Sequence, residues 1–297
     1  MVLPATVGGL ARTRIQDSSA SELDVVATYI DRGEGLIATV YVFWTETPDV
    51  ALWFDRAVAQ VVAGQAGSSQ PPTSVFTRPG ASAATGLRAA LPDNVPGMQS
   101  TAIAIAPHGS WLVKVRLGST RLAPAEADSR LTDFVAALGW PAEIGPVRVA
   151  APIQPCPSPL NLRRARIVRA DPTNLLADAL IGSEPLLPEA GQAPVYCREP
   201  GPTRPEYGVY RAGGSRDGYL IGLSDAGIAL ALSEAIDLGT LMGERPSSRR
   251  ISMVLLGRQE TALLPSFNRL PPPEQALEVA QIDRATISVS TREARPR

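Results

Sequence analysis

The most apolar stretch of the sequence is Leu36-Ile37-Ala38-Thr39-Val40-Tyr41-Val42-Phe43-Trp44. It has the length of a strand and falls well short of the roughly 18 apolar residues that a membrane-spanning helix needs. Since it is apolar on both faces, we expect a central strand with both sides covered. Residues 24–30, rich in β-branched and aromatic side chains, predict a neighbouring strand, and the loop 31–35 joins the two as a hairpin.

Two amphipathic helices are predicted in the first half of the chain. Thr47 is the expected N-cap of the first helix, Pro48 its first residue and Gly64 its end. The second helix is expected to begin at Pro124 and to stop at Gly139. Short strands are predicted between the helices at residues 73–78, 86–91, 100–106 and 111–117, and a turn at Pro107-His108-Gly109.

The order of these elements resembles the Mog1/PsbP-like fold, an antiparallel sheet with helices on its faces. The resemblance is carried by strand 36–44 with helix 48–64 and by strand 111–117 with helix 124–138, and it covers residues 1–142. Members of that fold class are mostly non-enzymatic adaptors, assembly factors and lipoproteins. The resemblance therefore implies a binding role, and it transfers no functional residue.

The remainder of the chain predicts a Pro-rich linker over 143–159 and a β-rich domain over 160–297. In this second domain we expect an antiparallel meander, a short helix capped by Asp171, another helix around residues 276–280 and a closing strand within 282–289. The predicted meander strands are 195–198, 207–211, 219–223, 228–232 and 251–256. The predicted fold class is α+β: an antiparallel sheet with flanking helices, then mostly antiparallel β structure with short helices.

The charge balance argues against a nucleic-acid partner. The formal net charge is −1, from 28 basic and 29 acidic residues, whereas nucleic-acid binding usually needs a basic excess. Lys114 is the single lysine, and we attribute the arginine excess to a GC-rich genome. The N-terminus lacks the basic and apolar regions of a signal peptide, so we expect either a cytosolic protein or a mature exported chain.

No motif predicts catalytic, metal-binding or cofactor-binding residues. His108 is the single histidine, and its neighbours Pro107 and Gly109 favour an exposed turn residue over a member of a catalytic triad. Two distant cysteines and one histidine do not make a usual zinc site. The sequence contains no G-x-S-x-G and no P-loop.

Cys156 and Cys197 leave two interpretations open. As a disulfide they would close a medium-sized loop in the second domain and indicate an oxidising compartment, the periplasm or the exterior. As two unrelated buried thiols they would be compatible with a cytoplasmic protein.

A basic cluster, Arg163-Arg164-Ala165-Arg166 with Arg169 nearby, is the strongest charge feature. It is a candidate patch for an anion or an acidic partner, and the alternative is a solvated or ion-paired face.

These observations predict a non-enzymatic binding or assembly factor of the bacterial cell envelope, with an unidentified protein partner and no cofactor. The alternative is a hydrolase or transferase with a carboxylate-based site in an interdomain cleft. A third interpretation is a structural subunit of an envelope or phage-like assembly.

Overall fold

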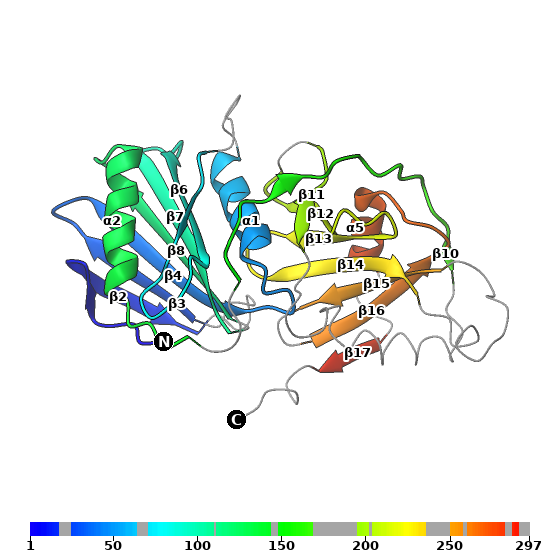
Figure 1. Cartoon of the computed structure of the whole chain (residues 1–297), viewed down its shortest axis with the longest axis horizontal. Coiled ribbons are helices and arrows are strands. Elements are labelled where there is room, and N and C mark those ends of the chain that lie inside the picture. Colours follow the sequence, from blue (N-terminus) through cyan, green and yellow to red (C-terminus); the bar gives the residue numbers. More distant parts are fainter. Residues whose placement is uncertain are drawn as a thin grey trace. The chain divides into compact units, whose positions relative to one another are not determined.

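The computed structural model describes residues 1–17, 25–63, 71–109, 111–143, 148–168, 195–201, 204–235, 250–257, 260–282 and 287–290. It confirms the predicted α+β class, with two mostly antiparallel sheets and their helices (Figure 1). The chain divides into two compact units. Unit 1 comprises Met1–Ile153, Thr203–Glu206 and Ser224–Gly227, and unit 2 comprises the remainder. The boundary at Ile153 lies inside the segment 143–159, whose role as a linker stays a prediction.

Unit 1 is built on an eight-stranded antiparallel sheet with the strand order β1-β2-β3-β4-β8-β7-β6-β5. The apolar segment Leu36–Trp44 forms β4, which lies between β3 and β8, so the prediction of a central strand is confirmed. The other strands are β1 (Thr6–Val7), β2 (Leu10–Gln16), β3 (Val25–Asp31), β5 (Ser74–Phe76), β6 (Gly86–Pro92), β7 (Ser100–His108) and β8 (Trp111–Ser119).

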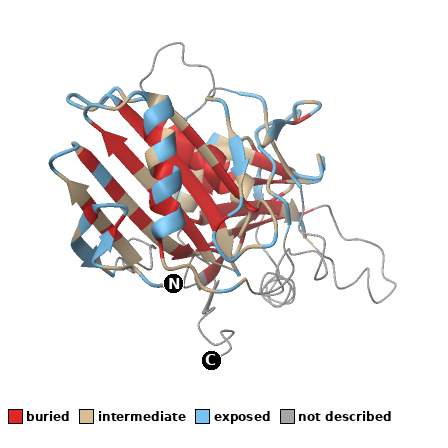
Figure 2. Cartoon of the chain, turned by 60° about the vertical axis from the view of Figure 1, so that its left-hand side comes forward, coloured by how far each residue is buried: buried red, intermediate tan, exposed pale blue. Residues whose placement is uncertain are grey.

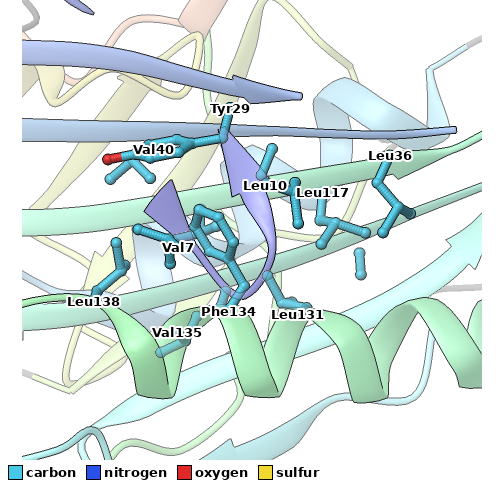
Figure 3. Packing of buried hydrophobic residues seen from close by; sticks show 14 of the residues in the cluster. Val7, Leu10, Tyr29, Leu36, Val40, Leu117, Leu131, Phe134, Val135 and Leu138 are labelled. Atoms are coloured by element: carbon cyan, nitrogen blue, oxygen red, sulfur yellow. The ribbon is translucent and has the colours of Figure 1, made fainter. Parts of the chain in front are cut away.

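The helix α2 (Pro124–Ala137) covers one face of this sheet. The carboxylate of Glu126 accepts a hydrogen bond from the Ala123 backbone amide at 3.0 Å, which satisfies a donor at the start of the helix. Figure 2 shows the outward side of α2 exposed and the strands behind it buried. Leu131, Phe134 and Val135 point from the helix toward the strands (Figure 3), and the Phe134 ring meets Tyr29 edge-on at a centroid distance of 5.3 Å.

The helix α1 (Val50–Val62) packs against β6 and β7. Its N-cap is Asp49 and not Thr47, because the Asp49 carboxylate accepts the Leu52 backbone amide at 2.8 Å. Thr47 instead uses its carbonyl to accept a 2.7 Å bond from the indole of Trp53. The predicted end at Gly64 lies outside the described residues.

Unit 2 contains a nine-stranded sheet in which β11 to β16 follow one another as an antiparallel meander, and β9 pairs with β11 in parallel. Its strands are β9 (Gln154–Pro155), β10 (Ile167–Val168), β11 (Tyr196–Arg198), β12 (Tyr207–Ala212), β13 (Gly218–Leu223), β14 (Ile228–Glu234), β15 (Ile251–Leu256), β16 (Glu260–Phe267) and β17 (Ile287–Ser290). The helix α5 (Pro273–Ile282) contributes Ala276 and Val279 to the apolar core of the unit. The predicted helix after Asp171 lies outside the described residues.

The strands β1, β2, β9, β10 and β16 were not predicted. β2 has only Leu10 fully buried, so it lacks the apolar alternation of a half-buried strand. β16 contains Pro265, which normally argues against a central strand. The structure accommodates this proline where the register between β15 and β16 shifts, between the pairs Ile251–Phe267 and Met253–Leu264.

The turn predicted at Pro107-His108-Gly109 begins later than expected. Pro107 and His108 belong to β7, where they pair with Leu112 and Trp111 of β8, and the chain turns at Gly109 with a φ of 59°. His108 is therefore a half-buried strand residue and not an exposed turn residue.

Candidate binding pocket

Unit 1 contains a pocket of about 190 Å³ between α1 and the strands β4 and β8. The side chains that give it its chemistry are Tyr41, Gln60, Lys114, Arg116 and Asp225. Ala57 and Val61 of α1 and Ile103 of β7 complete the wall.

The pairing of β4 with β8 brings the polar side chains together. Tyr41 pairs with Lys114 and Thr39 pairs with Arg116, and directly paired residues of antiparallel strands share a face. Side chains alternate along a strand, so Lys114 and Arg116 lie on the face opposite Val113 and Val115, which pack in the α2 core. The alternation in Trp111–Leu117 predicted a half-buried strand with Lys114 on its polar side. It did not predict that Lys114 itself is only 5% exposed.

The ammonium group of Lys114 is enclosed by acceptors and an aromatic ring. Its Nζ donates to Oδ2 of Asp225 at 2.6 Å and to the Asp225 carbonyl at 3.1 Å, and it lies 4.4 Å from the centroid of the Tyr41 ring. Burial lowers the pKa of Lys114, and the charge of Asp225 partly opposes this shift. Burial, reinforced by the charge of Asp225, raises the pKa of the Tyr41 hydroxyl.

Arg116 is the exposed charge of the pocket, with 42% of its side chain accessible. Its Nη2 lies 3.5 Å from Oδ2 of Asp93, which is nearly buried. Burial would raise the pKa of Asp93, but hydrogen bonds from Thr101 and the Val95 amide, with the charge of Arg116, outweigh burial and lower it. Arg116 is thus a second cationic group of the pocket, and it is paired with Asp93.

Arg56 of α1 holds the segment that carries Asp225. This side chain is 1% exposed, and its guanidinium donates to the carbonyls of Ser224 (2.9 Å), Arg204 (2.9 Å) and Pro205 (2.5 Å). The Thr45 hydroxyl donates to the carbonyl of Gly227 at 2.8 Å, at the other end of the segment Ser224–Gly227. These bonds fix the backbone on both sides of Asp225, which holds its carboxylate against Lys114.

The two cysteines form the disulfide that the sequence left as one of two interpretations. Cys156 and Cys197 are bonded, with their Cα atoms 4.9 Å apart. The bond joins the chain immediately after β9 to β11, with which β9 pairs. A disulfide of this kind fits an oxidising environment.

The basic cluster belongs to unit 2. Arg163, Arg164 and Arg166 are exposed on the segment that leads into β10, and Arg169 lies outside the described residues. The backbone of Arg166 is anchored by Asn268, whose side-chain oxygen accepts the Arg166 amide at 2.9 Å. The structure thus brings three of the four arginines together on one segment, and none of these three lines the pocket of unit 1.

His108 lies at the end of β7, and its Nδ1 is buried without a hydrogen-bond partner among the described residues. Burial and the nearby charge of Arg78 lower the pKa of His108. Within the part of the chain that the structure describes, no group of three or more His, Cys, Asp or Glu side chains is placed to hold a metal ion.

Comparison of the chain with protein-family models, with curated proteins and with solved structures found no match. No helix among the described residues is both long and apolar enough to cross a membrane.

Proposed function

We propose that this protein is a non-enzymatic binding or assembly factor of the bacterial cell envelope, located in the periplasm, and that its pocket at Lys114 receives an acidic group of its partner. The observation that carries the proposal is the enclosed Lys114 ammonium beside the exposed Arg116. Of the charged side chains that line the pocket, Lys114 and Arg116 are cationic and Asp225 is anionic, and Asp93 pairs with Arg116 without lining the pocket.

The chemistry of the pocket suits recognition of an anionic group. Binding sites fix their ligands with a few well-placed polar groups on a mostly preformed wall, and Lys114 and Arg116 supply two donors of that kind. The low exposure of Lys114 strengthens its interaction with any negative charge that reaches it, because little water screens the pair.

Two further observations support the binding role and the compartment. The Cys156–Cys197 disulfide is expected to persist in an oxidising compartment such as the periplasm. The resemblance of residues 1–142 to the Mog1/PsbP-like fold implies an adaptor or assembly role for unit 1.

Site-specific photo-crosslinking in the native host tests the binding role. A photoreactive residue at Gln60, which lines the pocket, is compared with the same residue at Asp133, which is exposed on α2. We expect a recurrent adduct from position 60 only, which the additional change Lys114→Met reduces strongly. Equal adducts from both positions, or an adduct that is indifferent to Lys114, would count against the proposal.

The compartment is tested by the thiol state of Cys156 and Cys197 in protein from its native host. Alkylation under denaturing conditions without reductant, followed by mass measurement, should show both thiols blocked in one chain. Two alkylated thiols would remove the periplasmic assignment while leaving the pocket and its crosslinking test unaffected.

A further inference from the structure

A second pocket of unit 1, here called the Arg78 pocket, lies beneath α2 on the sheet face opposite the Lys114 pocket. Its volume is about 220 Å³, and it is formed by the residues around β5, by Arg88 of β6 and by the second half of α2. The residues that matter for its chemistry are Phe76, Arg78, Arg88, Leu131, Val135 and Ala136.

The walls of the Arg78 pocket are mostly apolar. Phe76 comes from the end of β5, and Leu131 and Val135 are one turn apart on the same side of α2. No Asp or Glu side chain lines the pocket. Its volume lies below the roughly 300–1,000 Å³ of sites for drug-sized ligands, so it suits a single ring or a short chain.

Arg78 brings a buried positive charge to this apolar wall. The residue is 3% exposed, and its guanidinium donates to the carbonyls of Pro107 (3.0 Å), Pro79 (3.0 Å) and Pro141 (3.3 Å) and stacks over Trp140. These acceptors are neutral. Among the described residues Arg78 forms no ion pair, whereas buried charges in proteins are normally paired.

Glu143 is the acid whose charge acts on Arg78, and one of its two carboxylate oxygens is held by Ser82. Its Oε2 accepts hydrogen bonds from the backbone amide (2.9 Å) and the hydroxyl (2.7 Å) of Ser82, whereas its Oε1 is buried without a hydrogen-bond partner in the described part of the chain. Arg78 and Glu143 thus interact through their charges, without an ion pair between them in the described part of the chain.

Arg88 supplies a second guanidinium with an unused donor. It donates to the Thr132 hydroxyl and lies 3.5 Å from Asp128. Its Nε is buried and makes no hydrogen bond within the described part of the chain, and the same holds for Oδ1 of its ion-pair partner Asp128. A buried donor without an acceptor is unfavourable, and a ligand oxygen is one way to satisfy it.

We propose that the Arg78 pocket binds a small apolar monocarboxylate, with its ring or chain against Phe76, Leu131 and Val135 and its carboxylate facing the guanidinium groups of Arg78 and Arg88. Arginine forks match the geometry of a carboxylate, and the apolar walls exclude water from that contact. This site is independent of the Lys114 pocket and of the partner proposed for it.

Titration of the whole chain with benzoate, followed by amide chemical shifts, tests the proposal. We expect saturable shifts in α2 and β6 with a dissociation constant on the order of 1 mM or below. The neutral isostere benzamide should bind at least about tenfold more weakly, since it lacks the charge that the arginines recognise. Absence of saturable shifts with benzoate, or equal binding of benzamide, would overturn the proposal.

A matched pair of variants on α2 locates the site. Ala136 lines the pocket and Ala137 does not, and both side chains are exposed on the helix. Ala136→Phe should fill the pocket and abolish benzoate binding, whereas Ala137→Phe should leave it unchanged. Because both positions are exposed, both variants should fold, and loss of binding in both or in neither would contradict the assignment. Arg78→Gln, checked for folding, should weaken benzoate binding at least about tenfold without affecting benzamide.

Discussion

The Nζ atom of Lys114 lies 2.6 Å from Oδ2 of Asp225, although 111 positions separate the two residues in the chain. The two ends of this ion pair differ in exposure, because 6% of the lysine side chain and 27% of the aspartate side chain are accessible. Water can therefore solvate the carboxylate when the pair is broken, but it can hardly solvate the ammonium. This asymmetry predicts that the two partners contribute differently to stability.

Removal of Asp225 should destabilise the protein more than removal of Lys114. Asp225→Ala leaves a buried ammonium with one neutral acceptor and should lower the free energy of unfolding by about 2–3 kcal/mol. Lys114→Met leaves a partly solvated carboxylate and should lower it by less than about 1 kcal/mol. Urea unfolding of both single variants and the double variant measures the difference, with Asp133→Asn on α2 as the surface control. Equal losses from the two single variants would contradict the asymmetry.

The single lysine makes the protonation of Lys114 directly observable. Protein labelled only in lysine gives one side-chain ammonium signal, and its pKa should lie below the 10.5 of an unburied lysine because burial disfavours the charge. Asp225→Ala should lower the pKa further, since the Asp225 charge raises it. The signal is followed by NMR as a function of pH, and a pKa at or above 10.5 would refute the effect of burial.

The lowered pKa of Lys114 makes the free energy of unfolding depend on pH. Because the folded state releases this proton more readily than the unfolded chain, the unfolded chain binds more protons between the lowered pKa and 10.5. The wild-type protein should therefore gain stability relative to Lys114→Met as the pH rises through that window. A difference between the two proteins that falls with pH would have the wrong sign.

Sequence reasoning placed Lys114 on the correct side of its strand but not in the correct environment. The alternation of polar and apolar residues reports which side chains share a face, and it contains no information on what covers that face. Asp225 and α1 come from other parts of the chain, and only tertiary packing brings them close to β8. The one local signal was that Lys114 is the single lysine of the chain, and this fact alone does not predict a binding pocket.

Helices and strands with a strong local sequence pattern were predicted correctly, and those with a weak pattern were missed. β4 and α2 are strongly apolar or strongly periodic, and they were predicted within a few residues. β2 and β16 were missed because neighbouring strands stabilise them and their own sequences do not alternate. The disulfide remained one of two interpretations, since the distance between two cysteines depends on the fold.

Asp93 should contribute stability that disappears in acid. Its hydrogen bonds from Thr101 and Val95, with the charge of Arg116, overcome the opposing effect of burial and lower its pKa below 3.8. The contribution is present above 3.8 and is lost as the pH falls through the lowered pKa. Asp93→Asn should thus lower the free energy of unfolding by about 1–2 kcal/mol at neutral pH. Urea unfolding in acid should show this difference shrinking, and a difference that persists unchanged in acid would argue against the shift.

Reduction of the disulfide should loosen unit 2 locally. The Cys156–Cys197 bond constrains a loop with a sequence separation of 41, and its loss should lower the stability of the β9–β11 pair and its neighbour β12 by roughly 2–4 kcal/mol. Hydrogen exchange before and after reduction should show faster exchange in β11 and β12. The strands β4 and β8, which contain neither cysteine, provide the internal control. Unchanged exchange in β11 would indicate that the bond adds nothing to local stability.

Two hairpin glycines of unit 1 allow the stability cost of backbone strain to be measured separately from the cost of steric overlap. Gly35 and Gly109 both adopt positive φ, at 69° and 59°. A Cβ at Gly35 would overlap the Thr120 hydroxyl, whereas a Cβ at Gly109 meets nothing within 4 Å. Gly109→Ala should lower the free energy of unfolding by about 1 kcal/mol from the left-handed backbone alone. Gly35→Ala should lower it by roughly 2–3 kcal/mol, because the steric overlap adds to the same strain.

The overlap can be removed independently of the strain. In Gly35→Ala with Thr120→Ala the hydroxyl is absent, and the Thr120 Cβ lies 3.5 Å from the new methyl group, an ordinary van der Waals contact. The double variant should therefore recover the steric part and retain about 1 kcal/mol of backbone strain. Thermal or urea unfolding of the four proteins in this cycle measures the coupling between positions 35 and 120. Additive effects would mean that the β3–β4 turn avoids Thr120 by moving its backbone.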